Sequence, residues 1–344
     1  MFSFFAKRKA SAALINGIGV DVRPGETLLH AALRQGIDFP HSCRVGGCAS
    51  CKCKLISGQV KELTETGYIL SDEELDAGYI LACQSVPKGE VSIEVDLAAF
   101  QTRRRVRGKV VAQDKLTHNI TRLVIQLEES LPYKAGQYAD LCFDILPLYA
   151  RSFSFANRPQ PDGKVSFFIR KVQGGCVTSV INDQSLLGQG AMVVGPEGDF
   201  YLRPSAAPLL LVAGGSGLAP ILALLEEALS VGAQRSVTLL FGAREERDLY
   251  ALDEISALAA QWRASFHFVP VLSGATSDSN WQGARGLVTE LIPKFLENGP
   301  HAYLCGPPVM IDSAVLMLRG SALPCDHIYA DRFTPHHYPL AATA

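Results

Sequence analysis

The most constraining feature of this chain is a group of closely spaced cysteines near its N-terminus. Cys43, Cys48 and Cys51 share one loop, and a fourth cysteine follows at Cys83. The spacing C-x4-C-x2-C with a distant fourth cysteine is that of a plant-type [2Fe–2S] site. Two glycines in the loop (46 and 47) allow backbone angles that turn amide groups toward the sulfides. We therefore predict that these four cysteines are the metal ligands.

Two other metal sites fit the pattern less well. A zinc site usually has two pairs of closely spaced ligands, and here only Cys48 and Cys51 form such a pair. A Rieske centre needs two histidines, and only His41 lies near the loop. A fifth thiol, Cys53, falls on the strand expected to leave the loop, so we expect a packed side chain there rather than a ligand.

The composition describes a soluble multidomain protein. A length of 344 residues suits two or three domains, and a formal net charge of −2 argues against nucleic-acid binding. Four of the nine cysteines are assigned to metal, which leaves an odd number for pairing. A disulfide framework is therefore not expected, and a reducing cytoplasm is favoured. No signal peptide or membrane span is expected. The first ten residues, MFSFFAKRKA, permit peripheral membrane contact at most, and a frayed terminus is the favoured alternative.

Residues 1–98 are predicted to form a β-grasp ferredoxin domain. A strand over Ala13–Val22, a helix over Leu28–Arg34 and a closing strand over Val91–Val95 surround the cysteine loop. The segment Gln101–Arg107 contains four arginines and is expected to be a solvated linker.

Residues 99–204 are predicted to form a small antiparallel β-barrel that binds a flavin. Alternate residues of a strand share a face, so Arg151 and Phe153 point the same way. A guanidinium clamps a pyrophosphate, while an aromatic ring lies against an isoalloxazine. Ser154 is expected near the flavin N5.

A second feature of the same domain is a glycine pair before a short helix. Gly174 and Gly175, with Thr178 in the first helical turn, form a cradle of amides, hydroxyl and helix dipole for an anion. An ordinary turn and N-cap is the alternative. Further cofactor contacts are expected from the strand and loop that lead to this pair, at Phe168, Arg170 and Val172.

Residues 205–344 alternate strands with helices, which predicts an α/β domain with a parallel sheet. A helix is expected over Leu287–Leu296. Marked loops follow three strands, where such sheets bind ligands, although the G-x-G-x-x-G fingerprint is absent. The predicted nucleotide contacts are Gly214, Gly215, Ser216, Gly217, Gly242, Arg244, Asp248, Cys305, Gly306, Pro307 and Met310. Acidic residues after Arg244 favour NADH over NADPH.

In combination these motifs resemble the iron–sulfur flavoprotein reductases of bacterial oxygenases, in the ferredoxin–NADP⁺ reductase superfamily. The motif R-x-[YF]-S matches Arg151 to Ser154, with Phe153 where many members have tyrosine. The motif G-G-x-x-[ST] starts at Gly174, G-G-[ST]-G-x-A-P at Gly214, and C-G-P-P-x-M at Cys305. The N-terminal ferredoxin domain and strings such as FPHSCRVGGCASCKCKLISGQV are similar to the reductases of xylene monooxygenases and, less closely, of naphthalene dioxygenases.

The resemblance implies an NADH-dependent electron-transfer reductase. It would pass a hydride from NADH to FAD and send single electrons through a [2Fe–2S] cluster to an oxygenase that hydroxylates hydrocarbons or aromatic compounds. Ser154, Cys305 and Phe333 are the implied catalytic residues, with Phe333 lying against the flavin until nicotinamide displaces it. The expected partner is a membrane-bound di-iron hydroxylase rather than a soluble Rieske dioxygenase, and the chain is expected to be a monomer. The alternatives are a deoxysugar-pathway reductase and a redox sensor without turnover.

Overall fold

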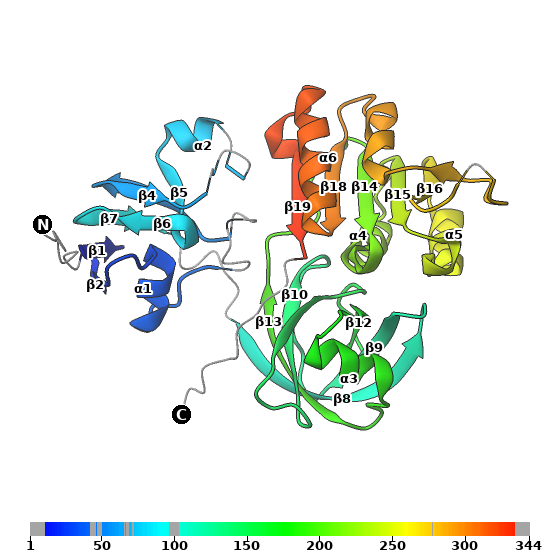
Figure 1. Cartoon of the computed structure of the whole chain (residues 1–344), viewed down its shortest axis with the longest axis horizontal. Helices are drawn as coiled ribbons and strands as arrows, with labels where there is room; N and C mark the ends of the chain where they lie inside the picture. Colours follow the sequence, from blue (N-terminus) through cyan, green and yellow to red (C-terminus); the bar gives the residue numbers. More distant parts are fainter. Residues whose placement is uncertain are drawn as a thin grey trace, which may run out of the picture. The chain divides into compact units, whose positions relative to one another are not determined.

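The computed structural model describes residues 11–41, 46, 50–64, 66, 69–70, 72–95, 103–276 and 278–333. The chain divides into two compact units, Met1–Gln101 and Thr102–Ala344. Figure 1 shows the helices and strands of both units and labels those for which there is room. Each unit has its own hydrophobic core.

The first unit is a mixed five-stranded sheet with helix α1 packed against it. Its elements are β1 (Ser11–Ile15), β2 (Ile18–Val22), α1 (Leu28–Arg34), β3 (Lys52–Ser57), β4 (Val60–Glu62), α2 (Asp72–Asp76), β5 (Tyr79–Leu81), β6 (Ser85–Pro87) and β7 (Val91–Glu94). The sheet order is β2-β1-β7-β3-β5, with β1 and β7 parallel and the other neighbours antiparallel. Thr27 caps α1 by accepting a hydrogen bond from the His30 amide. This arrangement confirms the predicted β-grasp domain.

The predicted single strand over Ala13–Val22 is wrong, because the chain reverses within it. Asn16 and Gly17 both have positive φ values, 49° and 80°, and Ile15 pairs with Ile18 across the turn. Positive φ at both central residues is the geometry of a two-residue hairpin turn, which the Asn-Gly pair favours. The apolar alternation continues through the turn and hides it in the sequence.

The second unit begins with an antiparallel barrel. Its elements are β8 (Arg104–Lys115), β9 (Ile120–Leu127), β10 (Tyr138–Phe143), β11 (Arg151–Ser154), β12 (Lys164–Arg170), α3 (Cys176–Asp183) and β13 (Gly190–Glu197). The strand order is β11-β10-β13-β8-β9-β12. A bridge between Phe155 and Phe167 joins the two ends and closes the barrel. The predicted antiparallel barrel is confirmed.

The prediction of a linker over Gln101–Arg107 is wrong for its second half. Strand β8 starts at Arg104, and Val106 is buried while Arg105 and Arg107 are exposed. Charged residues on the exposed face of a strand give nearly the same sequence pattern as a solvated linker. The arginines alone therefore did not distinguish a strand from a linker.

The rest of the unit is a six-stranded parallel sheet with helices on both faces. Its elements are β14 (Leu209–Gly214), α4 (Leu218–Ser230), β15 (Val237–Ala243), α5 (Leu252–Gln261), β16 (Phe266–Leu272), β17 (Ala284–Arg285), β18 (His301–Gly306), α6 (Pro308–Gly320) and β19 (Ile328–Arg332). The order is β17-β16-β15-β14-β18-β19, with every neighbouring pair parallel (Figure 1). Strands β14 and β18 are buried along their whole length, as expected for a parallel sheet covered on both faces. The predicted parallel sheet is confirmed.

The helix predicted over Leu287–Leu296 is instead a 3₁₀ helix over Val288–Phe295. Pro293 lies inside it, and a proline in that position removes a hydrogen bond of an α-helix. The apolar spacing thus predicted a helix at this position but did not specify its type.

The barrel and the parallel sheet share one hydrophobic core. Ile120, Ala156 and Phe168 of the barrel belong to the same buried cluster as α4 and the central strands of the sheet. Two polar contacts add to it: Arg122 forms an ion pair with Glu254, and the Arg158 amide donates to the Glu226 carboxylate at 3.0 Å. The ends of the parallel strands are therefore held against the barrel.

Candidate functional site

Two of the predicted metal ligands, Cys51 and Cys83, are brought together by strand pairing in the first unit. Strands β3 and β5 pair antiparallel, and the Ala82 amide donates to the Cys51 carbonyl at 3.0 Å. Both cysteines are buried. The other two predicted ligands, Cys43 and Cys48, lie outside the described residues.

The surroundings of these cysteines fit a [2Fe–2S] cluster. Gly46 has a φ of +74°, and a Cβ atom there would lie 2.8 Å from the Gln84 side chain, so any other residue would strain the backbone and displace Gln84. The buried Gln84 amide donates to the Cys83 sulfur at 3.5 Å. A donor beside a sulfur favours the thiolate, which is the form that binds iron.

Cys53 has the environment of a packed thiol. It is 1% exposed, and burial, with a smaller contribution from Cys83, raises the pKa of its thiol to about 12. A thiol that stays protonated is a poor metal ligand. This environment supports the prediction that Cys53 is not a ligand.

The predicted flavin strand β11 carries the guanidinium of Arg151. Arg151 and Phe153 are half-buried and share one face of the strand. Of the alternating residues, Ser152 is exposed and Ser154 is buried. The Arg151 guanidinium donates to the Ala150 carbonyl at 2.7 Å, and within the described part of the chain it forms no ion pair. An unpaired guanidinium on this face suits the pyrophosphate of FAD.

The glycine pair before α3 lies at the start of the helix, where the cradle is predicted. Gly174 has a φ of +73°, and Gly175 is the N-cap of the helix. The Thr178 hydroxyl accepts from the Val172 amide at 3.2 Å and donates to the Gly175 carbonyl at 3.3 Å. These bonds fix the loop and leave the first amides of the helix without intrahelical acceptors, as at any helix start. An anion is therefore favoured at this position.

A pocket opens at the carboxyl ends of β14, β15 and β18. Seven predicted nucleotide contacts line it: Gly214, Gly215, Gly242, Arg244, Asp248, Pro307 and Met310. Arg170 lines the same pocket from the barrel, and its Nη1 would lie 3.3 Å from a Cβ atom on Gly215. The pocket is thus shared by barrel and sheet, with a guanidinium beside the glycine turn.

The glycines of this turn are required by close backbone packing. A Cβ atom on Gly217 would lie 2.2 Å from the Cys305 carbonyl oxygen, and one on Gly214 would lie 2.5 Å from the Met310 sulfur. The turn therefore packs against the end of β18 and exposes backbone instead of side chains, which fits a bound pyrophosphate.

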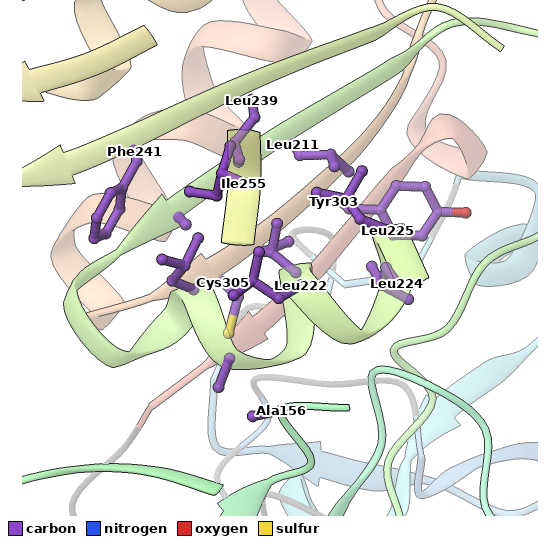
Figure 2. Packing of buried hydrophobic residues seen from close by; sticks show 14 of the residues in the cluster. Ala156, Leu211, Leu222, Leu224, Leu225, Leu239, Phe241, Ile255, Tyr303 and Cys305 are labelled. Carbon is purple, nitrogen blue, oxygen red and sulfur yellow. The ribbon is translucent and has the colours of Figure 1, made fainter. Parts of the chain in front are cut away.

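Of the predicted catalytic residues, Cys305 and Phe333 are neighbours. Cys305 is fully buried, and Figure 2 shows its sulfur directed toward the segment that carries Ala156. The Phe333 amide donates to the Gly306 carbonyl at 3.0 Å, and its ring packs against the core that contains Cys305. Burial raises the pKa of the Cys305 thiol well above its usual value. Ser154 is at the end of β11 and outside this core.

A carboxylate lies in the pocket beside Arg244. Asp248 accepts a hydrogen bond from the Glu245 amide at 3.0 Å and lies 3.6 Å from the His118 ring. A negative charge at this position disfavours the 2′-phosphate of NADPH. The geometry supports the predicted preference for NADH.

Sequence reasoning missed the rest of the pocket lining: Asn119, Ile120, Ala243, Val271, Ser273, Gly286, Leu287 and Val288. Ser273 directly follows β16, so the rule that ligands bind at strand ends could have identified it. No local signal marks Asn119 or Ile120, because they reach the pocket only through the packing of the barrel on the sheet.

Comparison with known proteins agrees with this geometry. Residues 14–88 match the 2Fe-2S iron-sulfur cluster binding domain, residues 107–201 the oxidoreductase FAD-binding domain, and residues 211–315 the oxidoreductase NAD-binding domain. The xylene/toluene monooxygenase electron transfer component of Pseudomonas putida is 41% identical, over 92% of this chain and 91% of that protein. The chain belongs to the family of oxygenase reductase components. As a member of it, the protein is an NADH-dependent oxidoreductase with FAD and a [2Fe–2S] cluster.

Other members of this reductase family show the same full-length likeness. The phenol 2-monooxygenase reductase component of Pseudomonas sp. (strain CF600) is 36% identical, over 91% of each chain. The crystal structure of an Amycolatopsis cytochrome P450 reductase covers 94% of this chain and 99% of its own, with a TM-score of 0.71 and 31% identity. Within the described ranges, no helix of this reductase is long and apolar enough to cross a membrane.

Proposed function

We propose that this reductase takes electrons from NADH in the pocket between barrel and sheet and delivers them singly, through its ferredoxin domain, to a hydroxylase. FAD, when bound, would supply the conversion between the two-electron chemistry of NADH and the one-electron chemistry of a [2Fe–2S] cluster. The observation that carries the proposal is the shared pocket, in which Arg170 of the barrel lies beside Gly215 of the sheet.

The residues of the chain bind and orient the reactants. Arg151, Gly174, Gly175 and Thr178 would hold the phosphates of FAD, and Phe153 would stack on its ring. The Gly214–Gly217 turn would hold the pyrophosphate of NADH. Positioning is sufficient for the hydride step, so no protein acid or base is assigned.

Cys305 and Phe333 would line the site where the two rings meet. The Phe333 amide donates to the Gly306 carbonyl, and its ring would lie against the flavin until nicotinamide displaces it. Ser154, buried at the end of β11, would approach the flavin from the barrel.

For the partner, we propose a membrane-bound di-iron hydroxylase, served by a monomeric reductase. The support is the degree of likeness: 41% identity to the xylene/toluene monooxygenase component, against 36% to the reductase component of a naphthalene 1,2-dioxygenase system. Aromatic hydrocarbons are the substrate class that these relatives indicate.

The electron route is tested with Cys83→Ser. The purified protein should reduce both ferricyanide and cytochrome c with NADH. The variant should keep its FAD and ferricyanide activity but lose cytochrome c reduction, because single electrons leave through the cluster. Cys53→Ala is the matched control, a buried thiol in the same domain, and it should keep both activities. Cytochrome c reduction at the wild-type rate by Cys83→Ser would remove the cluster from the route.

The partner is tested by reconstitution. Two separate mixtures are prepared, each with the reductase and NADH. One contains washed membranes with a di-iron hydroxylase, and the other contains a purified soluble Rieske dioxygenase. Product formation only with the membranes supports the proposal. Product formation only with the soluble dioxygenase contradicts the partner assignment and leaves the NADH reductase activity intact.

A further inference from the structure

Tyr250 lies at the centre of the contact between the nucleotide turn, the sheet and the barrel. It follows β15 and is 4% exposed. Its hydroxyl donates to the Gly215 carbonyl at 2.9 Å. It was not among the predicted site residues, and it does not line the pocket. It contacts the glycine turn instead, and Gly214 and Gly215 of that turn line the pocket.

The orientation of the Gly215 carbonyl decides where the next amide points. Gly215 has a φ of +56°, and its carbonyl accepts from both the Leu218 amide and the Tyr250 hydroxyl. In a planar trans peptide the carbonyl of one residue and the amide of the next point in opposite directions. Holding the Gly215 oxygen toward Tyr250 therefore turns the Ser216 amide away from the core, toward the exposed side of the turn.

The tyrosine ring is fixed by edge contacts on two sides. Phe168 of the barrel packs at 5.6 Å and 79°, and Phe241 of β15 packs at 5.5 Å and 90°. The next residue, Ala251, has a φ of +56°, in the left-handed region. A non-glycine residue keeps that conformation only where its surroundings impose it. The hydroxyl therefore has one available direction, onto Gly215.

We infer that Tyr250 is a positioning residue that holds the Gly215–Gly217 turn with its amides directed at the pyrophosphate of NADH. The inference rests on the proposed use of this turn for NADH. Burial raises the pKa of the Tyr250 hydroxyl well above its usual value, so the group remains a donor throughout the working pH range.

The test is Tyr250→Phe in the full-length holoprotein. Removing the hydroxyl should weaken binding of NAD⁺ and of ADP-ribose by the same factor, about tenfold, because both contain the pyrophosphate. Isothermal titration calorimetry measures this directly. In steady-state assays the KM for NADH should rise similarly, while kcat with ferricyanide changes less than about twofold.

Tyr133→Phe is the matched control. Tyr133 is also buried, its hydroxyl donates to the Asn157 carbonyl at 3.0 Å, and its ring stacks on Phe155 at 3.8 Å. It should lose comparable thermal stability and bind NAD⁺ within about twofold of wild type. Equal nucleotide affinity in both variants overturns the inference.

A second variant covers the case in which Tyr250→Phe folds poorly. Phe241→Leu keeps the hydroxyl but removes one edge contact, so NAD⁺ affinity should fall between those of the two tyrosine variants. An NAD⁺ affinity equal to that of the wild type would contradict the proposal that the edge contacts of Phe168 and Phe241 orient the Tyr250 ring. If the wild-type protein fails to oxidise NADH, the proposed function fails, and ADP-ribose binding still tests Tyr250 independently.

Discussion

In the second unit one glycine turn precedes α3 and another precedes α4, and a single glycine in each shows a different reason for the absence of a side chain. In the barrel, Gly174 has a φ of +73°, and no described atom lies within 4 Å of a Cβ placed there. In the sheet, Gly217 has an ordinary φ of −62°, but a Cβ atom would lie 2.2 Å from the Cys305 carbonyl oxygen. Gly174 therefore needs glycine for its backbone angle, whereas Gly217 needs it for a close contact between backbones.

This difference follows from the architecture around each turn. Gly174 lies in a loop before the eight-residue helix α3, and a Cβ atom there would meet no described atom beyond its chain neighbours within 4 Å. The sheet turn lies between two fully buried strands, β14 and β18. A parallel sheet brings the ends of its strands together, so its ligand turns form part of the core.

The largest effect is expected for Gly217→Ala. The added methyl meets the β18 backbone, which cannot move without breaking the sheet, so the unfolding free energy should fall by about 3 kcal/mol. Thermal denaturation measures the loss. Gly320→Ala is the control in the same domain, because its Cβ meets no described atom within 4 Å. Equal stability of the two variants would show that the close approach at Gly217 is not real.

An intermediate effect is expected for Gly174→Ala. The left-handed backbone should cost about 1 kcal/mol of stability, and FAD retention should fall because the loop shifts. Gly188→Ala provides the comparison, since Gly188 also has a left-handed φ of +82° and its nearest neighbour beyond the turn is at 3.7 Å. It should lose similar stability but keep its FAD. Loss of FAD in both variants would contradict a specific role for the Gly174 turn.

The smallest effect is a pH dependence at the opposite end of β18. Burial, with a smaller contribution from His327, lowers the pKa of His301 below its usual 6.5. The unfolded chain therefore takes up a proton more readily than the folded one, and stability should fall as pH drops through 6.5 toward the lower folded value.

Melting temperatures at pH 7.5 and 5.5 test this effect, with His301→Gln as the comparison. The variant should lose less stability on acidification than the wild type. An identical pH dependence in the two proteins would show that protonation of His301 does not cause the loss of stability.

Features that depend on neighbours along the chain were predictable. Arg151 and Phe153 share a face because strand periodicity is two, and the Gly214 turn follows its strand directly. The Asn16-Gly17 hairpin was also readable but was missed, because apolar alternation continues across it. Pro293 similarly marked an irregular helix that apolar spacing concealed.

The sequence by itself determined the identity of the three cofactor-binding domains and the types of residue each contains, because short motifs fix local geometry and chemistry. Only the tertiary structure decided that Arg170 lies beside Gly215 and that Asn119 enters the nucleotide pocket. It also decided that Tyr250 supports the glycine turn from behind. These contacts join segments far apart in the chain, and the shared hydrophobic core that creates them leaves no local pattern.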